Sequence, residues 1–214
     1  MNETVGRRER KKAQTRQALA DAAGRLFLEH GYEKVGVRDV AEAADVSVTT
    51  LFKHFPSKEA LVFDEDEDVE AALVAAVRDR AAGQSVLHAL RDHLLATRAT
   101  RRIDDPDVVA HMNLVRQTPE LQEYWDRMWR RHEFALAAAI AEATGAPEGD
   151  LGAAALARFA LDTTSLIRGQ DDQQQAMRDL FALLETGFGD VAAATGDAGD
   201  ASAGSTGAAA SGGH

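Results

Sequence analysis

The spacing of apolar residues is helical along nearly the whole chain. Leu, Val, Ala and Phe recur three and four positions apart, and no stretch alternates apolar and polar residues over the length of a strand. This pattern predicts an all-α protein of about nine helices. The expected ranges are 9–30, 37–44, 48–54, 57–80, 85–100, 107–116, 120–144, 150–168 and 173–188, with Gly or Pro at most of the breaks.

The third expected helix, residues 48–54, has two distinct faces. At 100° per residue, Leu51 and Phe55 form a stripe that should be buried, whereas Thr49 and Lys53 point away from it. Ser47 is expected to cap the helix, Thr50 and Phe52 to lie on its flanks, and His54 to lie nearer the core. The outward face therefore carries groups that bond phosphates and base edges.

A shorter helix, residues 37–44, precedes this one across the turn Ala44-Asp45-Val46-Ser47, and the helix 9–30 backs both. Two short amphipathic helices joined by a tight turn are typical of a helix-turn-helix, whose second helix enters the major groove. The alternative is a small helical bundle with a polar surface and no nucleic-acid partner.

The motifs that decide between these interpretations are Leu26-Phe27, Gly31-Tyr32, Val37-Arg38-Asp39-Val40-Ala41, Val46-Ser47, Thr50-Leu51-Phe52 and His54-Phe55-Pro56-Ser57-Lys58. With them, residues from about Arg10 to Val62 resemble the DNA-binding domain of the TetR family of bacterial regulators. The resemblance implies an N-terminal three-helix helix-turn-helix domain and a C-terminal helical effector-binding and dimerisation domain. It also implies DNA contacts at Ser47, Val48, Thr49, Thr50, Phe52, Lys53, His54 and Lys58.

Three positions depart from that family pattern. Gly36 stands where a capping Thr is usual, and it brings no hydroxyl. Asp45 replaces the usual turn Gly, but Asp tolerates the left-handed conformation better than most residues. Phe52 replaces a common Tyr, whose hydroxyl typically meets a phosphate. Each change weakens backbone contact without abolishing the fold.

Charge divides the chain in two. The net charge is −11, yet residues 1–63 hold 11 of the 24 Lys and Arg and 9 of the 35 Asp and Glu, which leaves the remainder strongly acidic. Six basic residues and one acid lie between Arg7 and Arg16. We interpret this segment as a basic arm able to follow a DNA backbone. The alternative is a frayed, merely solvated terminus.

Composition sets the remaining limits. The chain has no Cys, no secretory signal and no apolar run long enough to span a membrane, so a cytoplasmic protein is expected. The expected domains are 1–63, the helix-turn-helix with its basic arm, and 64–190, for ligand binding and dimerisation. Residues 191–214 are almost entirely Ala, Gly, Ser, Thr and Asp, which predicts a disordered tail.

No catalytic or metal constellation is recognisable in residues 64–214. Asp64, Asp66 and Asp68 resemble the start of a calcium loop, but the later Gly and Glu positions are Val69 and Ala75. The acidic run is interpreted as a solvated patch. No cofactor, no metal and no enzymatic activity are expected.

An aromatic cluster on the helix 120–144 suggests a ligand cavity. It holds both Trp residues, and the predicted lining is Leu90, Leu94, Met112, Val115, Tyr124, Trp125, Met128 and Trp129. Ordinary core packing is the alternative. The stretch from Asn113 to Gly145 further resembles TetR-type effector domains that accept acyl-CoA-like molecules. Its basic residues would then meet an anionic headgroup, unless they form surface ion pairs: Arg116, Arg127, Arg130 and Arg131.

The last two helices each carry an apolar stripe. The stripes are Leu156, Phe159, Ala160, Thr163 and Ile167 on one, and Met177, Leu180, Phe181, Leu184 and Phe188 on the other. Paired across a two-fold axis they would form a four-helix bundle, as the family resemblance implies; alternatively they close the monomer core.

These patterns and the family resemblance together predict a homodimeric transcriptional repressor that binds a palindromic double-stranded DNA operator and is released by a small, largely apolar effector molecule. The rival hypothesis is a helical lipid or small-molecule carrier, or an enzyme, without sequence-specific DNA binding. The partners expected are therefore DNA, an effector and a second copy of the chain, and no membrane.

Overall fold

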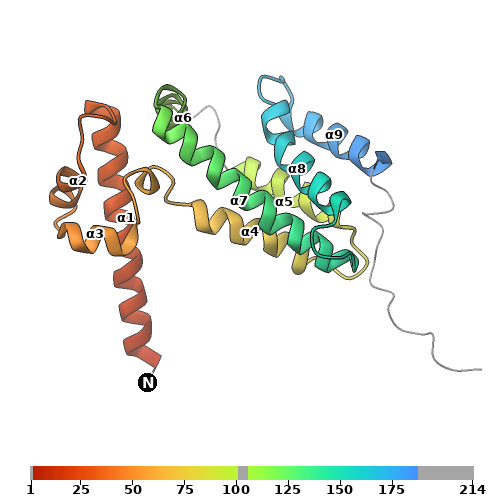
Figure 1. Cartoon of the computed structure of the whole chain (residues 1–214), viewed down its shortest axis with the longest axis horizontal. Helices are drawn as coiled ribbons and strands as arrows, with labels where there is room; N and C mark the ends of the chain where they lie inside the picture. The colour runs from red at the N-terminus through yellow and green to blue at the C-terminus, as the bar shows by residue number, and fades with distance from the viewer. Residues whose placement is uncertain (1, 101–105, 188–214) are drawn as a thin grey trace, which may run out of the picture.

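The computed structural model describes residues 2–100 and 106–187. Within this part of the chain, nine α-helices and one short 3-10 turn account for all the regular structure, as the apolar spacing predicts. Figure 1 shows a small three-helix headpiece beside a larger helical body. The predicted tail, residues 191–214, and Phe188 lie outside the described residues.

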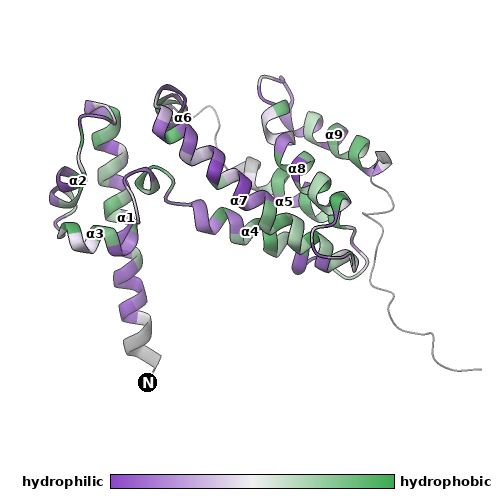
Figure 2. Cartoon of the chain, viewed as in Figure 1, coloured by the Kyte–Doolittle hydropathy of each residue, from purple (hydrophilic) through white to green (hydrophobic). Residues whose placement is uncertain are grey.

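The headpiece consists of α1 (Asn2–His30), α2 (Val37–Ala43) and α3 (Val48–His54). Helix α1 begins seven residues earlier than expected, so the basic arm is helical and continuous with the rest of α1. Arg, Lys, Gln and Ala are good helix formers, which favours this continuation. In Figure 2 the N-terminal half of α1 is hydrophilic, and apolar residues appear where it packs in the headpiece.

The expected helix 57–80 is broken, and this prediction is wrong. A 3-10 turn, η1 (Glu59–Leu61), is followed by a non-helical step and then by α4 (Asp66–Arg78). The four consecutive residues Ala60, Leu61, Val62 and Phe63 are all buried. Consecutive residues on one α-helix would spread over 300° of its surface, so burying all four requires the chain to leave the helical path. Burial of a Val, Leu or Phe side chain stabilises by about 1.5–3 kcal/mol each, which outweighs the lost helical turn.

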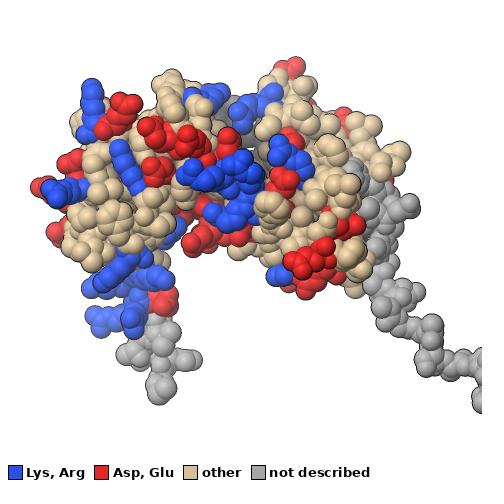
Figure 3. All heavy atoms as spheres, viewed as in Figure 1, with Lys and Arg blue, Asp and Glu red and all other residues tan. Residues whose placement is uncertain are grey.

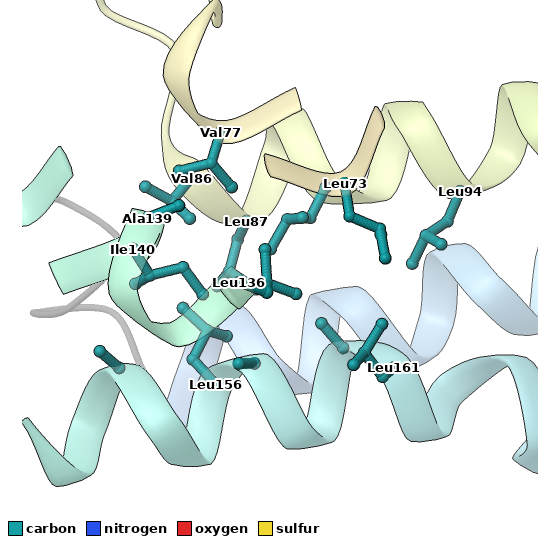
Figure 4. Packing of buried hydrophobic residues seen from close by; sticks show 14 of the residues in the cluster. Leu73, Val77, Val86, Leu87, Leu94, Leu136, Ala139, Ile140, Leu156 and Leu161 are labelled. Atoms are coloured by element: carbon teal, nitrogen blue, oxygen red, sulfur yellow. The ribbon is translucent and has the colours of Figure 1, made fainter. Parts of the chain in front are cut away.

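The body contains α4 and five further helices, whose bounds lie within about two residues of expectation. They are α5 (Val86–Thr100), α6 (Pro106–Gln117), α7 (Pro119–Thr144), α8 (Leu151–Leu166) and α9 (Gln173–Gly187). Helix α7 runs through the centre and packs on α4, α6 and α8. Figure 4 shows Leu136 and Ile140 of α7 meeting Leu73, Leu87 and Leu156 from three neighbouring helices.

A second core joins the headpiece to the body. Leu19 and Phe55 of the headpiece belong to the same buried cluster as Val115 of α6 and Leu121 and Met128 of α7. The boundary expected at 63/64 therefore marks a step in the chain path but not a division of the core. This shared core fixes where the headpiece sits on the body.

Candidate DNA-binding surface and ligand cavity

Helix α3 begins at a side-chain cap. The Oγ of Ser47 accepts a hydrogen bond from the backbone N–H of Thr50 at 3.1 Å and pairs with the Thr50 hydroxyl at 2.9 Å. Leu51 and Phe55 are almost completely buried behind the helix. The cap fixes the start of α3 and the two apolar side chains fix its rotation, so the opposite face is presented rigidly.

The turn before α3 has a specific geometry. Asp45 adopts a left-handed φ of 53°, as the sequence predicts for this position. Its N–H donates to the carbonyl of Glu42 at 3.0 Å, and the N–H of Val46 donates to the carbonyl of Ala41 at 2.9 Å. These two bonds satisfy carbonyls at the end of α2 and form a Schellman motif with Asp instead of Gly. At the other end of α2, the Asp39 carboxylate accepts a hydrogen bond from the N–H of Gly36 at 2.7 Å, in place of a hydroxyl cap.

The outward face of α3 has the predicted pattern of exposure. Thr49, Phe52 and Lys53 are exposed, with the Phe52 ring at 48% of its full exposure. Val48, Thr50 and His54 are half-buried on the flanks. An exposed Phe beside Thr and Lys can make apolar contact with a thymine methyl or with deoxyribose, which partly replaces the missing Tyr hydroxyl.

One of the expected phosphate contacts, Lys58, also has contacts inside the protein. Lys58 Nζ donates to the carbonyl of Tyr32 at 2.6 Å and lies 3.9 Å from the centre of the Tyr32 ring. Burial lowers the pKa of Lys58 from its usual value. The pKa of His54 is lowered as well, first by burial and then by the charges of Lys12 and Arg16. Lys58 therefore uses at least one of its three N–H donors for a hydrogen bond inside the headpiece.

Arg16 has a role that the sequence does not predict. Its guanidinium donates to the carbonyl of His54 at 2.8 Å and to the carbonyl of Asp64 at 2.6 Å, and it lies 4.4 Å from the centre of the Phe55 ring. Both carbonyls lie where helical hydrogen bonding stops, at the end of α3 and before α4. One side chain of α1 thereby joins the end of α3 to the start of the body. The sequence showed Arg16 only as the end of a basic run, and only the break before α4 reveals its acceptors.

The acidic run contains a buried residue, so the interpretation as a solvated patch is wrong for Asp66. Asp66 is 8% exposed and accepts hydrogen bonds from Arg131 at 2.6 Å and from the ring of His132 at 2.7 Å. Arg131 also binds Glu70 at 2.9 Å. Hydrogen bonding to Asp66 raises the pKa of Arg131. These contacts attach the first turn of α4 to α7. Among the described residues, no group of three or more His, Asp or Glu side chains is placed to hold a metal ion.

The body contains a cavity of about 920 Å³ between α4, α5, α6, α7 and α8. Four of the eight residues predicted for it line its wall, namely Leu94, Met112, Trp125 and Trp129. The other apolar residues of the lining are Val69, Ala72, Leu73, Val108, Val109 and Leu161. Its size and apolar wall suit a molecule of drug or lipid dimensions.

The other four predicted lining residues lie elsewhere, which corrects the prediction. Leu90 belongs to the body core, and Val115 and Met128 belong to the core shared with the headpiece. Tyr124 lines a separate cleft between headpiece and body, where Phe63 stacks on its ring at 5.2 Å. A helical wheel identifies an inward face, but it does not distinguish a cavity wall from a packed core.

Charged residues surround the cavity. Arg116 and Arg130 line it, together with Arg158 and Arg168, which were not predicted. Arg158 is bound to Glu133 and Asp162 at 3.0 and 2.9 Å. Arg127 and Arg131 are absent from the lining; Arg127 approaches Glu123 at 3.8 Å and Arg131 binds Asp66, so ion pairing accounts for these two. The buried indole N–H of Trp129 has no hydrogen-bond acceptor in the described structure.

The stripes predicted for a dimer interface are mostly buried within the single chain. Six of the ten residues have almost no exposure and close the monomer core: Leu156, Ala160, Thr163, Ile167, Met177 and Phe181. Leu180 and Leu184 are half-buried, whereas Phe159 is 48% exposed. Three large apolar side chains of α8 and α9 that were not predicted are also exposed, namely Leu151, Leu166 and Leu183. The face of α8 and α9 available to a partner therefore overlaps the predicted stripes only at Phe159, Leu180 and Leu184.

A helix-turn-helix headpiece built onto a helical body with a cavity is an architecture typical of DNA-binding regulators. The model of bacterial regulatory proteins of the TetR family matches residues 19–64, and that of the MftR C-terminal domain matches residues 84–196. The chain belongs to the TetR family of transcriptional regulators, with a C-terminal domain of the MftR type. This family is not enzymatic, which confirms the expectation that the chain is no enzyme.

Individual relatives agree with this membership. The chain is 35% identical to the transcriptional regulator TcmR of Streptomyces glaucescens over 65% of each chain. It is 31% identical to MftR of Mycobacterium tuberculosis, over 68% of this chain and 72% of that one. The alignment with TcmR thus spans slightly less than two thirds of that protein.

Solved structures support the fold. AlkX, a TetR-family repressor from Dietzia, superposes with a TM-score of 0.55 at 19% identity, covering 82% of this chain and 98% of AlkX. GusR of Salmonella enterica superposes with a TM-score of 0.53 at 23% identity, covering 83% of this chain and 95% of GusR. Within the described residues, every helix falls short of the length or the hydropathy that a bilayer crossing demands.

Proposed function

We propose that the protein is a homodimeric repressor that binds a palindromic operator through α3 and is released by a small, largely apolar molecule. The supporting observation is the exposed Thr49 and Lys53 ridge, held from behind by the buried Leu51 and Phe55. A single headpiece buries roughly 600–1,000 Å² on DNA, so two copies are needed for tight, specific binding. Membership of a regulator family argues against the carrier hypothesis.

The contacts to DNA follow from the geometry of α3. Ser47 and Thr50, at the N-terminal end, are placed for a phosphate, because free backbone N–H groups and the helix dipole favour an anion there. Val48, Thr49 and Lys53 face base edges, and Phe52 packs against sugar or a thymine methyl. His54 and Lys58 add contacts at the C-terminal side.

The exposed apolar face of α8 and α9 supports the dimer. Phe159, Leu166 and Leu183 are 48%, 63% and 69% exposed, which is unfavourable for side chains of this size in a monomer. Pairing this face with its copy across a two-fold axis would form a four-helix bundle in which these residues are covered. The half-buried Leu180 and Leu184 would lie at its edge.

The cavity supports the effector site. Its apolar wall favours a hydrocarbon chain. Five carboxylates line it as well (Glu65, Asp68, Asp126, Glu133 and Asp162), and Arg158 is paired with two of them. The anionic group of an acyl-CoA-like molecule would therefore bind at Arg116, Arg130 or Arg168. Trp129 of the wall contacts His132 edge-on at 5.2 Å, and His132 binds Asp66 at the start of α4. A ligand that displaces Trp129 would thus shift α4 and the headpiece. A difference of about 1–3 kcal/mol between the two states is enough for a 5- to 150-fold switch.

The experiment that tests the proposal is a gel-shift assay with the DNA flanking the protein's own gene. The wild-type protein should bind one site specifically and with steep salt dependence. Thr49→Ala combined with Lys53→Ala should abolish the specific shift, while Lys34→Ala, an exposed lysine of the headpiece away from α3, should keep it. Undiminished specific binding by the double variant would show that α3 does not read the operator.

A further inference from the structure

Helix α1 extends well beyond the headpiece that it supports. The family model begins at residue 19, and Figure 1 shows the preceding turns of α1 projecting past α3. Side chains 6–14 are all exposed, so this extension contributes nothing to either core. It carries five basic residues, Arg7, Arg8, Arg10, Lys11 and Lys12.

The basic residues lie on two different faces of the extension. At 100° per residue, Arg8 and Lys12 share a face with Arg16, whereas Arg7, Arg10 and Lys11 lie on the other side. Arg16 is fixed against the end of α3 by its bond to the carbonyl of His54. Helical rise therefore places Lys12 about 6 Å and Arg8 about 12 Å farther along the axis from this anchor. Lys12 is close enough to His54 for its charge to contribute to the lowered pKa of that residue, after burial.

The charges of the extension are not compensated within the protein. Among the described residues, no ion pair involves any of these five side chains. Arg8 with Lys12, and Arg7 with Lys11, are like charges four positions apart, which repel each other on a helix. Figure 3 shows the Lys and Arg side chains gathered below α3, on a protein whose net charge is −11. A polyanion lying along the helix would relieve this repulsion.

We propose that the extension of α1 is a second DNA-contacting element, in which Arg8 and Lys12 bind backbone phosphates beyond those reached by the C-terminal end of α3. This inference rests on the proposed DNA binding by α3. It adds a sequence-independent contact that lengthens the footprint on the side of each half-site where α3 ends. Because the extension is a helix continuous with α1, its cations are held in place, unlike those of a flexible tail.

DNA is favoured over other anions by position. The face of α1 that carries Arg8 and Lys12 begins at Arg16, which contacts the last residue of the recognition helix. A duplex that occupies α3 therefore passes beside this face. The acidic body of a partner subunit is the competing anion. In that case the charges would strengthen the dimer instead of the complex with DNA, and the two outcomes are measurable separately.

The test is the salt dependence of operator binding by the full-length protein. The probe is a duplex selected by the wild-type protein from a randomised pool, measured from about 50 to about 200 mM KCl. Arg8→Gln with Lys12→Gln should make the slope of log K against log salt shallower by about 1.8, since each phosphate contact contributes about 0.9. Over this range the variant should lose about tenfold less affinity than the wild type.

The matched control is Arg7→Gln with Lys11→Gln, which removes the same charge from the same helix, but from side chains that point about 140–180° away from Arg16. It should keep the wild-type slope. An unchanged slope for the Arg8 and Lys12 variant, an equal change in both variants, or a weaker dimer with unaltered DNA binding would each overturn the inference. Absence of sequence-specific binding by the wild type would instead overturn the proposed function, so the two failures are distinguishable.

Discussion

Arg16 and His54 are joined by a hydrogen bond of 2.8 Å from the guanidinium to the backbone carbonyl at the end of the recognition helix. The same guanidinium binds the carbonyl of Asp64, so its position depends on where α4 begins. These two hydrogen bonds of Arg16 link the orientation of α3 to the body, and Arg16 does not need to touch DNA to do so.

Arg16→Lys should weaken operator binding without changing its salt dependence. A lysine cannot span both carbonyls, so the end of α3 loses its attachment to the start of α4. We expect a loss of about tenfold in specific affinity and about 1–3 kcal/mol in the free energy of unfolding. Titrations at several salt concentrations give the slope of log K for operator binding against log salt, and the loss of a phosphate contact would make this slope shallower. Arg25→Lys, on an exposed part of α1, is the control and should change neither quantity.

Asp66 should be the most sensitive acidic residue of α4. Asp66→Ala leaves the buried ring of His132 without its partner, and we expect a loss of about 3–5 kcal/mol in the free energy of unfolding, measured by urea denaturation. Asp68→Ala removes an exposed carboxylate from the same turn and should cost under about 0.5 kcal/mol. Similar losses in the two variants would contradict the role of the buried contact.

Asp45 carries a carboxylate close to the expected path of the DNA. Asparagine tolerates the same left-handed conformation, so Asp45→Asn should leave stability within about 0.5 kcal/mol of the wild type. Loss of the negative charge should raise operator affinity a few-fold at low salt. Asp45→Ala removes the charge too but should destabilise the turn by about 1 kcal/mol. Thermal unfolding and gel shifts measure the two effects separately.

Both tryptophans of the chain line the cavity, so tryptophan fluorescence reports on ligand binding at this site. Lauroyl-coenzyme A should produce a saturable change in emission. Leu161→Phe narrows the cavity and should weaken binding at least about tenfold, a loss of 1.4 kcal/mol. Leu28→Phe, on the exposed surface of the headpiece, should bind as the wild type does. Equal binding by both variants would place the ligand elsewhere.

The oligomeric state should depend on the exposed face of α8 and α9. Phe159→Glu combined with Leu183→Glu introduces carboxylates where the two copies meet and should yield monomers by light scattering. Phe134→Glu alters a still more exposed aromatic side chain, on α7, and this control should remain dimeric. A dimeric double variant would exclude this face as the interface.

Helix bounds and turn chemistry were predictable from the sequence because they depend on local residues. Gly31 and Asp45 have the left-handed conformations expected at their turns, and Ser47 caps α3 as its position predicts. The rotation of α3 was predictable too, since Leu51 and Phe55 lie within about 40° of each other on the helical wheel, opposite Thr49 and Lys53.

Features that depend on contacts between distant segments were not predictable in this way. The break before α4 arises because Phe63 and its neighbours fill a core that α6 and α7 also line. Burial of Asp66 requires Arg131 and His132, which lie 65 and 66 residues later in the sequence, on α7. The same limit applies to α8 and α9, where an apolar stripe identifies a buried face but does not tell which helix covers it.

The core that Leu19 and Phe55 share with Val115, Leu121 and Met128 has a consequence for protein engineering. Grafting this headpiece onto the effector domain of another regulator would bring together two half-cores that did not evolve as a pair. A working chimera should therefore carry α6 and the first half of α7 along with the headpiece, although these helices come from the middle of the sequence.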